Sequence, residues 1–495
     1  MKTKIFINTT YNETRVCVFE DDLLSEIYIE RSSEPLIVGN IYKGRIGKVV
    51  PGMQAAFVDI GIEKSGFISV EDVYEESLIE YFLDEKEEPS SDKKSKQLIQ
   101  DMLNESQEVI VQVIKEPVNG KGPKLSSYIG IPGKYTVLLG TIDITGISRK
   151  IEDQEERDRL TGIIKSNKPE NVGFIARTAS IGINENEIKE DMNNLLNIWK
   201  EIRNRSEHLS TPSLLYQEPK LYLRAVRDFI TSNVEEIIID SENTFRDISE
   251  YLSNYQPEKK SLLKKYNDKE PLFSKFGIED ELNKLYNKKV WLKSGAHLII
   301  EEAEGLTVID VNTGKYISDK GHEETIFKIN IEAAAEAARH IRLRNLVGII
   351  VIDFIDIKNQ ELKDQIYEHF MESLKNDKAR SVVHPISAFG VMQLTRQRVR
   401  ESVLKALAED CPVCNGTGFV KSKETICYEI LRDVKVLLLN TKAGKIRIIS
   451  SKAIIDNLKK TEGKSIEEIS DENKVEIVFE QSDKYTDNFE MITEN

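Results

Sequence analysis

This chain of 495 residues has few cysteines, no long apolar run and no excess of basic residues. Four cysteines are too few for a disulfide scaffold and indicate a reducing cytoplasm. The amino-terminal residues MKTKIFINTTYNETRV lack the apolar core of a secretory signal, and no run elsewhere is long enough to span a bilayer. With 40% hydrophobic and 31% charged residues at this length, we expect a soluble cytoplasmic protein of several domains.

The formal net charge is −15, which on its face argues against a nucleic-acid partner. Binding depends on local fields, however, and much of the acid is concentrated in segments 71–88 and 462–494. Basic residues gather in three other places: Lys115, Lys121 and Lys124; Arg339, Arg342 and Arg344; and Arg396, Arg398 and Arg400. A cluster of like charges is usually a solvated face, so these clusters alone assign no function.

Two short apolar runs, each ending in an aspartate, stand out from the rest of the chain. GLTVIDVNTG at 305–314 contains Asp310 and Asn312, and GIIVIDFID at 348–356 contains Asp353. Their β-branched residues and flanking turn formers predict buried strands, and apolar residues at helical spacing between them predict a connecting helix. A strand–helix–strand unit makes its two strands parallel. We therefore predict an α/β domain with both aspartates at one edge of its sheet.

That edge is where open α/β sheets place their sites. Two carboxylates brought together repel each other unless a cation lies between them, and oxygen ligands of this kind suit magnesium. Asp310 and Asp353 are therefore candidate magnesium ligands, with Asn312 as a third oxygen ligand or an orienting group. For either aspartate alone, a role as helix cap or turn residue stays open. Asp356 lies outside the shared pattern and is a weaker candidate.

The rest of the chain divides into shorter segments. Residues 1–36 contain strands that are too short for a domain, so we expect them to pair with residues 221–285. Residues 37–125 alternate apolar strands with Gly-rich turns, as in an OB-fold barrel, and carry a polar insert at 84–96. The predicted fold class is multidomain α/β, with a barrel near the amino terminus, mixed α/β domains after it and a small α/β domain at the end.

The barrel segment resembles the S1 RNA-binding domain, in which aromatic side chains stack on single-stranded bases. Phe57 and Phe67 match those aromatic positions, and Lys121 lies where a cation would contact the RNA backbone. From spacing alone, both phenylalanines are better interpreted as core residues, because most phenylalanines are buried.

Nearly the whole chain resembles the ribonuclease E/G family, and it is most similar to the short members that lack a disordered scaffold arm. The matching blocks, in the family's order, are the S1-like segment, GFIARTA, LTVIDVNTG, VIDFID, ISAFGVMQLTRQR and CPVCNGTG. The resemblance implies an endoribonuclease that cleaves single-stranded RNA and leaves a 5′-monophosphate on the downstream fragment. It implies that Asp310 and Asp353 hold magnesium beside Asn312, for metal-assisted hydrolysis.

The family also implies a domain plan and a cellular role. Its parts are an RNase H-like part from 1–36 and 221–285, an S1 domain at 37–125, a 5′-phosphate sensor segment at 126–220, a DNase I-like catalytic domain at 286–407, a zinc link at 408–421 and a small domain at 422–495. The expected role is ribosomal RNA maturation and messenger RNA decay, and the sequence does not rank the two.

A pocket for the 5′-monophosphate of RNA is implied by the resemblance around GFIARTAS. The matching residues are Arg177, Thr178, Arg149, Val137, Gly133 and Arg380. A guanidinium can hold two phosphate oxygens and a hydroxyl can donate to a third. Lys150 stands where a second arginine is expected.

Cys411 and Cys414 form a CxxC pair whose thiolates can turn towards one ion. A structural zinc needs four ligands, and neither Cys17 nor Cys427 has a matching partner. On the residues alone, a redox pair and a half-site shared by two chains both remain open. The family resemblance implies the second, with a zinc shared between protomers and dimers pairing into a tetramer.

Two other functions are compatible with the residues. A non-catalytic RNA-binding factor would use the barrel and keep the aspartates for structure. A magnesium-dependent DNase would use the same aspartates, because no residue in the sequence reveals a reader of the RNA 2′-hydroxyl.

Overall fold

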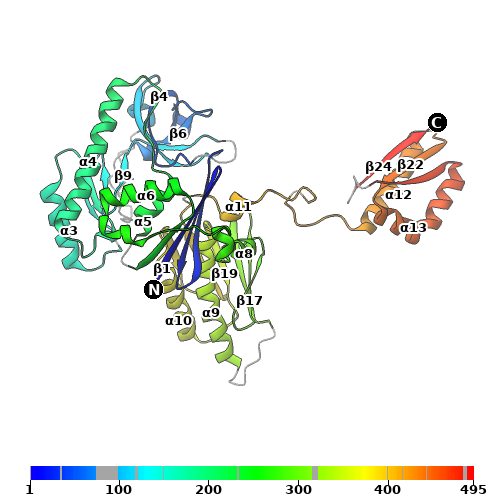
Figure 1. The fold of residues 1–495 in the computed structure, drawn as a ribbon. Helices are drawn as coiled ribbons and strands as arrows, with labels where there is room; N and C mark the ends of the chain where they lie inside the picture. The colour runs from blue at the N-terminus through cyan, green and yellow to red at the C-terminus, as the bar shows by residue number, and fades with distance from the viewer. Residues whose placement is uncertain are drawn as a thin grey trace. The chain divides into compact units, whose positions relative to one another are not determined.

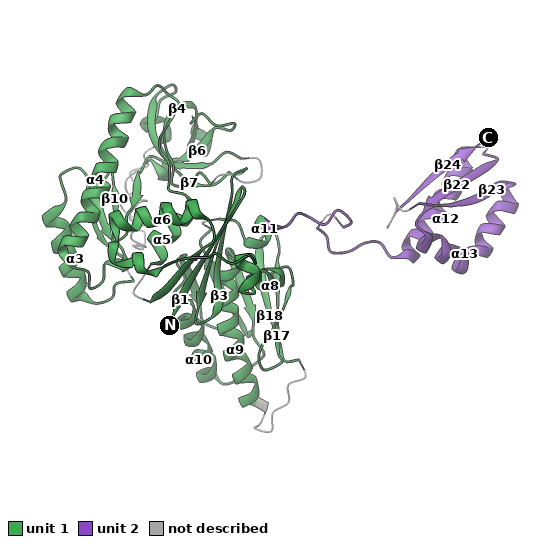
Figure 2. Cartoon of the chain, viewed as in Figure 1, with its two compact units in different colours: residues 1–406 green, residues 407–495 purple. Residues whose placement is uncertain are grey.

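The computed structural model describes residues 2–33, 36–73, 98–117, 121–148, 150–230, 233–314, 322–398, 400–414, 416–441, 443–482 and 488–494. The chain forms two compact units, residues 1–406 and residues 407–495 (Figure 2). The prediction of a multidomain α/β protein is confirmed. Among the described residues, no helix is long and apolar enough to cross a membrane. The predicted insert at 84–96 and Arg149 lie outside the described residues.

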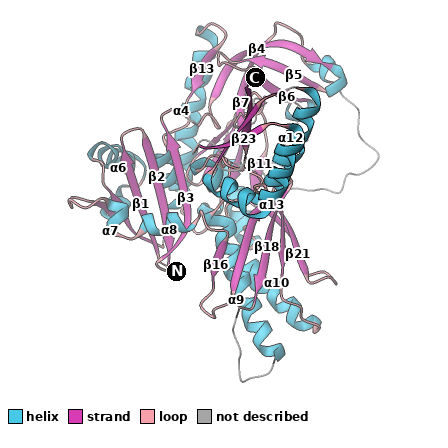
Figure 3. Cartoon of the chain, turned by 90° about the vertical axis from the view of Figure 1, so that its right-hand side faces the viewer, coloured by secondary structure: helices cyan, strands magenta, loops and turns pink. Residues whose placement is uncertain are grey.

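The first sheet joins the amino terminus to a later part of the chain. Its strands, in spatial order, are β15 (Leu263–Lys265), β14 (Val234–Ile239), β1 (Thr3–Thr10), β2 (Glu13–Glu20) and β3 (Leu23–Arg31). The first three strands of the chain run side by side as an antiparallel meander, and β14 pairs with β1 in parallel (Figure 3). The helices of this part are α5 (Leu221–Phe229), α6 (Glu242–Tyr255), α7 (Leu272–Lys275) and α8 (Ile278–Lys284), with the 3₁₀ segment η4 (Pro257–Leu262).

A closed five-stranded barrel follows β3, as the sequence predicted. Its strands, around the barrel, are β4 (Ile41–Val50), β5 (Ala55–Asp59), β6 (Gly66–Ser69), β8 (Lys124–Ser126) and β7 (Glu108–Lys115). The barrel closes because β7 pairs with both β8 and β4. The outer strand β13 (Ser213–Tyr216) extends the sheet beyond β4. The short segments here are η1 (Pro51–Met53), η2 (Val70–Asp72) and α2 (Ile99–Met102).

The next part is a four-stranded sheet packed against two helices. Its strands, in spatial order, are β11 (Thr145–Ile147), β12 (Gly173–Ala176), β10 (Thr136–Leu139) and β9 (Gly130–Pro132). Its helices are α3 (Gln154–Asn167) and α4 (Glu185–His208), and η3 (Thr178–Ser180) follows β12. The side chain of Asn184 caps α4 by accepting from the Glu187 amide. Phe174 and Trp199 are buried between sheet and helices.

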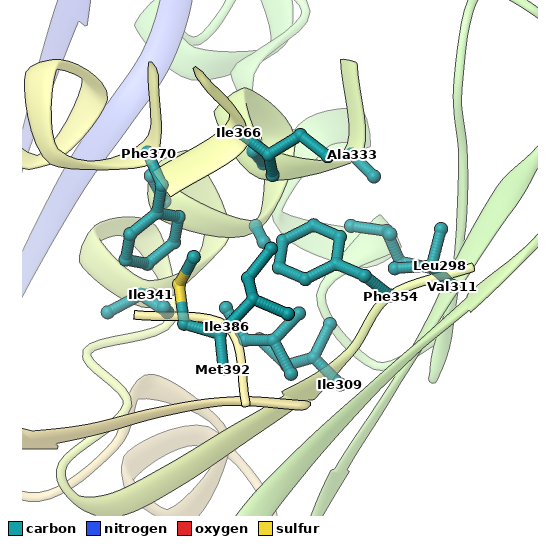
Figure 4. Packing of buried hydrophobic residues seen from close by; sticks show 14 of the residues in the cluster. Leu298, Ile309, Val311, Ala333, Ile341, Phe354, Ile366, Phe370, Ile386 and Met392 are labelled. Carbon is teal, nitrogen blue, oxygen red and sulfur yellow. The ribbon is translucent and has the colours of Figure 1, made fainter. Parts of the chain in front are cut away.

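A six-stranded mixed sheet carries the predicted aspartates. Its strands, in spatial order, are β16 (Lys289–Trp291), β17 (His297–Glu302), β18 (Leu306–Asn312), β19 (Gly348–Asp353), β21 (Val391–Arg396) and β20 (Ser381–His384). Its helices are α9 (His322–Leu343), α10 (Gln360–Leu374) and α11 (Val403–Leu407), and α9 connects the parallel strands β18 and β19 (Figure 1). Figure 4 shows Met392 of β21 close to Phe370 of α10, and Ile309 of β18 in the same apolar cluster.

The carboxyl end of α9 is tied to the first sheet by arginines. Arg342 donates to Glu20 at 2.8 Å and to Glu26 at 2.8 Å. Arg339 donates to the Leu24 carbonyl at 2.8 Å, and Arg344 donates to the Leu285 carbonyl at 2.9 Å. Arg342 and Arg344 are buried, so neither forms a solvated face: Arg342 joins α9 to the first sheet, and Arg344 joins it to the segment after α8.

The second unit is an α/β fold with a three-stranded sheet whose central strand is β22 (Lys445–Ser450). It pairs in parallel with β23 (Glu476–Gln481) and antiparallel with β24 (Phe489–Glu494). Its helices are α12 (Lys423–Asn440) and α13 (Lys452–Asn473). The small α/β domain predicted at the end of the chain is confirmed. Cys427 of α12 lies in the apolar core of this unit, so it is no partner for the exposed cysteine pair.

Candidate active site on the open face of the six-stranded sheet

Asp310 and Asp353 lie next to each other on adjacent parallel strands, where they are register partners. Successive side chains of a strand point to opposite faces of a sheet. Their neighbours Ile309 and Ile352 are fully buried in the cluster with α9 and α10, so both carboxylates point to the other face. We call this the open face, and it carries the side chains of Trp291, His297, Ile299, Val308, Asp310, Asn312, Val351 and Asp353.

Asn312 lies on the same face two residues beyond Asp310, and its amide donates to the Asp310 carboxylate at 2.7 Å. Partial burial raises the pKa of the Asp353 carboxyl, and the charges of Asp310 and Asp356 raise it further. These carboxylates therefore repel one another, and a cation between them would relieve the repulsion. The donor set fits a hard cation that prefers oxygen ligands, such as magnesium.

Two aspartates alone do not enclose a metal ion. Within the described ranges, no group of three or more His, Cys, Asp or Glu side chains is gathered closely enough to hold one. Magnesium usually keeps several waters and takes one or two carboxylates together with substrate phosphates. The residues present therefore fit a magnesium ion that is completed by water and substrate, with Asp310 and Asp353 as its ligands and Asn312 as the residue that orients Asp310.

Close backbone approaches fix the loops around the aspartates. Gly314, after β18, has a φ of 63°, and a Cβ atom there would lie 2.5 Å from the Gly295 carbonyl oxygen. Glycine is the residue that accepts both constraints. On the other strand, the fully buried Asn330 of α9 donates to the Ile355 carbonyl at 2.7 Å and accepts from the Ile355 amide at 3.1 Å. Asn330 therefore holds the loop that follows Asp353.

The sequence reasoning missed an aromatic pair beside this site. Trp291 and His297 are register partners, and His297 is in turn the register partner of Asn312. Partial burial lowers the pKa of His297, Lys289 lowers it further, and Asp310 opposes the shift. The signal in the sequence was the pair of aromatic residues in VWLKSGAHLII, one on each side of the turn at Ser294 and Gly295.

The predicted phosphate-pocket residue Arg177 follows β12 and already has protein partners. Its guanidinium donates to Asp228 at 2.8 Å and also to the Gly133 carbonyl. Burial by itself would raise the pKa of Asp228, but Arg227 and Arg177 hold the pKa of that carboxyl well below its usual range. Thr178 is exposed, and its hydroxyl lies 3.4 Å from that of Ser148.

Gly133 lies beside Arg177 because its carbonyl accepts from the guanidinium, and Val137 lies opposite Ile175, two residues before Arg177. A Cβ atom on Gly133 would lie 2.6 Å from a carboxylate oxygen of Asp191, so only glycine fits there. Asp191 of α4 accepts hydrogen bonds from the amides of Lys134, Tyr135 and Thr136 at 2.9–3.1 Å. The carboxylate thereby fixes the turn before β10, a role that sequence reasoning did not anticipate.

Two lysines connect this region to the segment that carries Arg380. Lys150 donates to the Asp377 carbonyl at 2.8 Å, and Lys378 donates to the Asp228 carbonyl at 3.1 Å. Asp377 forms a buried ion pair with Arg396 at 2.7 Å. The structure thus brings Arg177, Thr178, Val137, Gly133 and the segment of Arg380 together. Lys150, for which the resemblance predicted an arginine, links this region to Asp377.

A cavity of about 440 Å³ lies beneath the same residues, and Val137, Asp228, Lys378, Arg396 and Arg400 contribute to its walls. Arg396 belongs to a predicted basic cluster, yet it is buried and paired with Asp377. Arg400 packs over the ring of Tyr28 at 3.9 Å. This cluster is therefore part of the joint between domains, as is the one at the end of α9.

The barrel carries Phe57 and Phe67 as cross-strand partners with ring centroids 6.1 Å apart. Phe57 is 37% exposed and Phe67 is half-buried, so the expectation of core residues is wrong for Phe57. The reason is strand alternation: Ala56 and Val58 face the barrel interior. Lys121 is exposed just before β8.

Two further lysines extend this barrel face. Lys48 is the register partner of Phe57, and Lys124 is the register partner of Phe67. Across β4, β5, β6 and β8, two phenylalanine rings therefore lie side by side with a lysine at each end. Lys124 is also paired with Asp72 at 2.8 Å. Rings flanked by cations form the arrangement that single-stranded nucleic acid binds.

The pair Cys411 and Cys414 lies at the start of the second unit. Backbone amides of Cys414 and Val413 lower the pKa of the Cys411 thiol. The Gly418 amide donates to the Cys414 sulfur at 3.4 Å. Both sulfurs therefore accept N–H bonds, and for Cys411 this favours the thiolate that metal binding needs.

A barrel with outward aromatic rings, joined to an α/β domain with paired aspartates on an open sheet face, defines a multidomain nuclease. The chain belongs to the ribonuclease E/G family, whose model matches residues 130–399. A second model, described as the RNase E/G thioredoxin-like domain, matches residues 410–494. The resemblance that the motif blocks indicated is confirmed.

Named relatives match along most of the chain. Ribonuclease G of Haemophilus influenzae is 40% identical over 431 residues, which cover 87% of each protein. Ribonuclease G of Escherichia coli K12 is 37% identical over 469 residues, or 95% of each protein. Ribonuclease E of Haemophilus influenzae is 33% identical over 482 residues, which cover 97% of this chain and 50% of that protein.

Proposed function

We propose that this member of the ribonuclease E/G family, an endoribonuclease acting on RNA, cleaves single-stranded RNA in a magnesium-dependent reaction in the cytoplasm. The downstream product keeps a 5′-phosphate, and substrates with a 5′-monophosphate are favoured. The cellular roles are ribosomal RNA maturation and messenger RNA decay. The observation that carries the proposal is the register pairing of Asp310 with Asp353 on the open face.

Asp310 and Asp353 would hold the magnesium ion, and Asn312 would keep the Asp310 carboxylate in position. When bound, magnesium activates water and offsets the charge that develops on the phosphate. Phe57 and Phe67 would stack on bases of the same strand, with Lys121 at its backbone. The protein's own part is thus to present a single strand to two fixed carboxylates.

The test uses 5′-labelled single-stranded RNA and DNA of the same sequence, with magnesium and with EDTA. Asp310→Asn and Asp353→Asn should each abolish cleavage of RNA while leaving RNA binding intact, because they weaken the ion without emptying the core. Asp356→Asn is the matched control and should retain most activity. If EDTA or the two substitutions left cleavage intact, the magnesium assignment would be wrong.

The same experiment decides between the alternatives. Binding of RNA without cleavage under any condition would favour a non-catalytic RNA-binding factor. Cleavage of DNA at the same rate as RNA would favour a general magnesium-dependent nuclease, because it would mean that no residue recognises the 2′-hydroxyl.

Preference for a 5′-monophosphate would rest on Arg177 together with Thr178, Val137, Gly133 and Arg380, and on Arg149 as the further cation that the resemblance implies. A guanidinium has five N–H donors, so contacts with Asp228 and Gly133 leave donors for a phosphate. Arg177→Ala should slow cleavage of 5′-monophosphorylated RNA by roughly ten- to one-hundred-fold, the cost of one lost charge-assisted contact. Cleavage of 5′-hydroxyl RNA should change little, and an equal loss on both RNAs would make Arg177 structural.

Cys411 and Cys414 would form half of a zinc site that is completed by a second protomer, with dimers pairing into a tetramer. Two polarised sulfurs per chain and four ligands per structural zinc support this count. Cys411→Ser should lose zinc and reduce the mass of the assembly. Metal analysis and light scattering check this, and a variant that kept both its zinc and its mass would exclude the shared site.

A further inference from the structure

Trp291 is a large aromatic side chain that the fold leaves 64% exposed. Its ring lies against that of His297, with centroids 5.2 Å apart and planes tilted by 52°. The Lys289 ammonium lies 4.0 Å from the centroid of the Trp291 ring. An exposed ring, a second ring and a cation thus gather at one end of the open face, and neither the fold nor the aspartate pair accounts for them.

Strand register places this group beside the aspartates. Trp291, His297 and Asn312 are successive partners across β16, β17 and β18, so all three side chains lie on the open face. The next row along the strands is Lys289, Ile299, Asp310 and Asp353. Since neighbouring strands lie about 4.8 Å apart, Trp291 is about 10 Å from Asn312 across the sheet. A nucleoside attached to a phosphate at the aspartates can reach across this span.

We propose that the ring pair of Trp291 and His297 stacks on the base of a nucleotide next to the scissile phosphate. The pair is a substrate-positioning subsite, and this proposal rests on the proposed function. Every base has a π-face, so such stacking holds a single strand without selecting its sequence. Lys289 lies on the same side of the sheet, where its charge meets the RNA backbone.

The chemistry of the patch favours RNA over a protein partner. Cores of protein interfaces are depleted in charged residues and especially in lysine, whereas Lys289 sits directly on the exposed ring. The barrel face shows the same combination, with Lys48 and Lys124 flanking Phe57 and Phe67. Two places on one chain therefore combine exposed rings with lysines.

The first experiment compares Trp291→Ala with Trp291→Phe in the full chain. Trp291→Ala should raise the KM for an unstructured RNA by roughly ten-fold or more, with kcat nearly unchanged, because stacking binds substrate and transition state alike. Trp291→Phe keeps a ring and should restore most of the affinity. Leu306→Ala is the matched control, because Leu306 is an exposed apolar residue of the same sheet face at the far end of β18.

The second experiment replaces single nucleotides around one cleavage site by abasic ones. With the wild type, one position beside the cut should show a penalty as large as that of Trp291→Ala. Combining that abasic RNA with Trp291→Ala should add no further loss, because both remove the same contact. Fully additive penalties at every position would overturn the proposal, as would a wild-type KM for Trp291→Ala.

The outcomes distinguish a failure of the stacking subsite from a failure of the proposed function on which it rests. If the wild type did not cleave RNA at all, the proposed function would fail. If the wild type cleaved RNA and Asp353→Asn did not, while Trp291→Ala behaved as wild type, the stacking subsite alone would fail. A change in the mass of the assembly with no change in KM would make the ring pair a contact between copies and would also overturn the subsite.

Discussion

On β19, Ile350 and Ile352 are fully buried against α9 and α10, whereas Ile349, Val351 and Asp353 point to the open face and meet solvent. Both sets come from five consecutive residues, Ile349 to Asp353, and only the alternation of the strand separates them. The covered face contributes apolar burial, and the open face contributes charge and aromatic surface. Substitutions one residue apart should therefore act on different properties, stability on one side and chemistry on the other.

The largest effects are expected from the neighbours Ile352 and Asp353. Ile352→Ala should lower the free energy of unfolding by about 2–5 kcal/mol, through lost burial and a cavity. The folded fraction should keep its kcat/KM. Asp353→Asn should abolish cleavage and leave the free energy of unfolding unchanged or raised, because it removes a repulsion with Asp310 and Asp356.

Urea unfolding and RNA cleavage on the same samples check this pair of variants. Asp310→Asn and Ile309→Ala repeat the comparison on the neighbouring strand, where Ile309 is also fully buried. A large loss of stability in Asp353→Asn would mean that the two faces are not independent.

Asn330→Ala tests whether a residue on the covered face can affect the chemistry of the open face. Asn330 belongs to the covered face, yet both of its side-chain hydrogen bonds go to Ile355, two residues beyond Asp353. Its loss leaves the carbonyl and amide of the partly buried Ile355 without these partners, which costs about 1–3 kcal/mol. Because the loop after Asp353 is then less restrained, the magnesium concentration needed for half-maximal cleavage should rise.

A magnesium titration of Asn330→Ala and Ile352→Ala distinguishes positioning from stability. Both variants are destabilised, and only Asn330→Ala should shift the magnesium dependence. Identical titrations for the two variants would assign Asn330 to stability alone.

The sequence was most informative where pattern is local. Alternation and β-branched content predicted β18 and β19, and helical spacing predicted α9, so the meeting of Asp310 and Asp353 followed from topology. The barrel was predicted because its strands are nearly consecutive.

What the sequence could not predict depends on partners far apart in the chain. Arg177 meets Asp228, and Gly133 meets Asp191, across 51 and 58 residues. From the sequence alone Arg342 is expected to be a surface cation, yet it is buried against Glu20. The exposure of Phe57 depends on which face of β5 points into the barrel interior. Spacing within one strand does not determine that face.

The smallest expected effect concerns the pH dependence of the free energy of unfolding. Helix α9, on the covered face, contains a buried histidine. His340 accepts from Arg344 at 3.0 Å and lies 3.3 Å from Glu336. Burial lowers the pKa of His340 to about 4, with Arg339 and Arg344 adding to the shift and Glu336 opposing it. The folded protein therefore holds this imidazole neutral at pH values where an unfolded chain protonates it.

An unfolded histidine titrates near pH 6.5, so between pH 6.5 and 4 the unfolded state binds more protons than the folded state. The contribution of His340 to stability is present above pH 6.5 and is lost as the pH falls through this window. Between pH 6.5 and 5 the wild type should lose about 1–2 kcal/mol through this group. His340→Gln keeps a polar group without titration, so its free energy of unfolding should fall less over the same range. Urea unfolding at half-unit pH steps measures the difference, and parallel curves for the two proteins would show that His340 carries no such linkage.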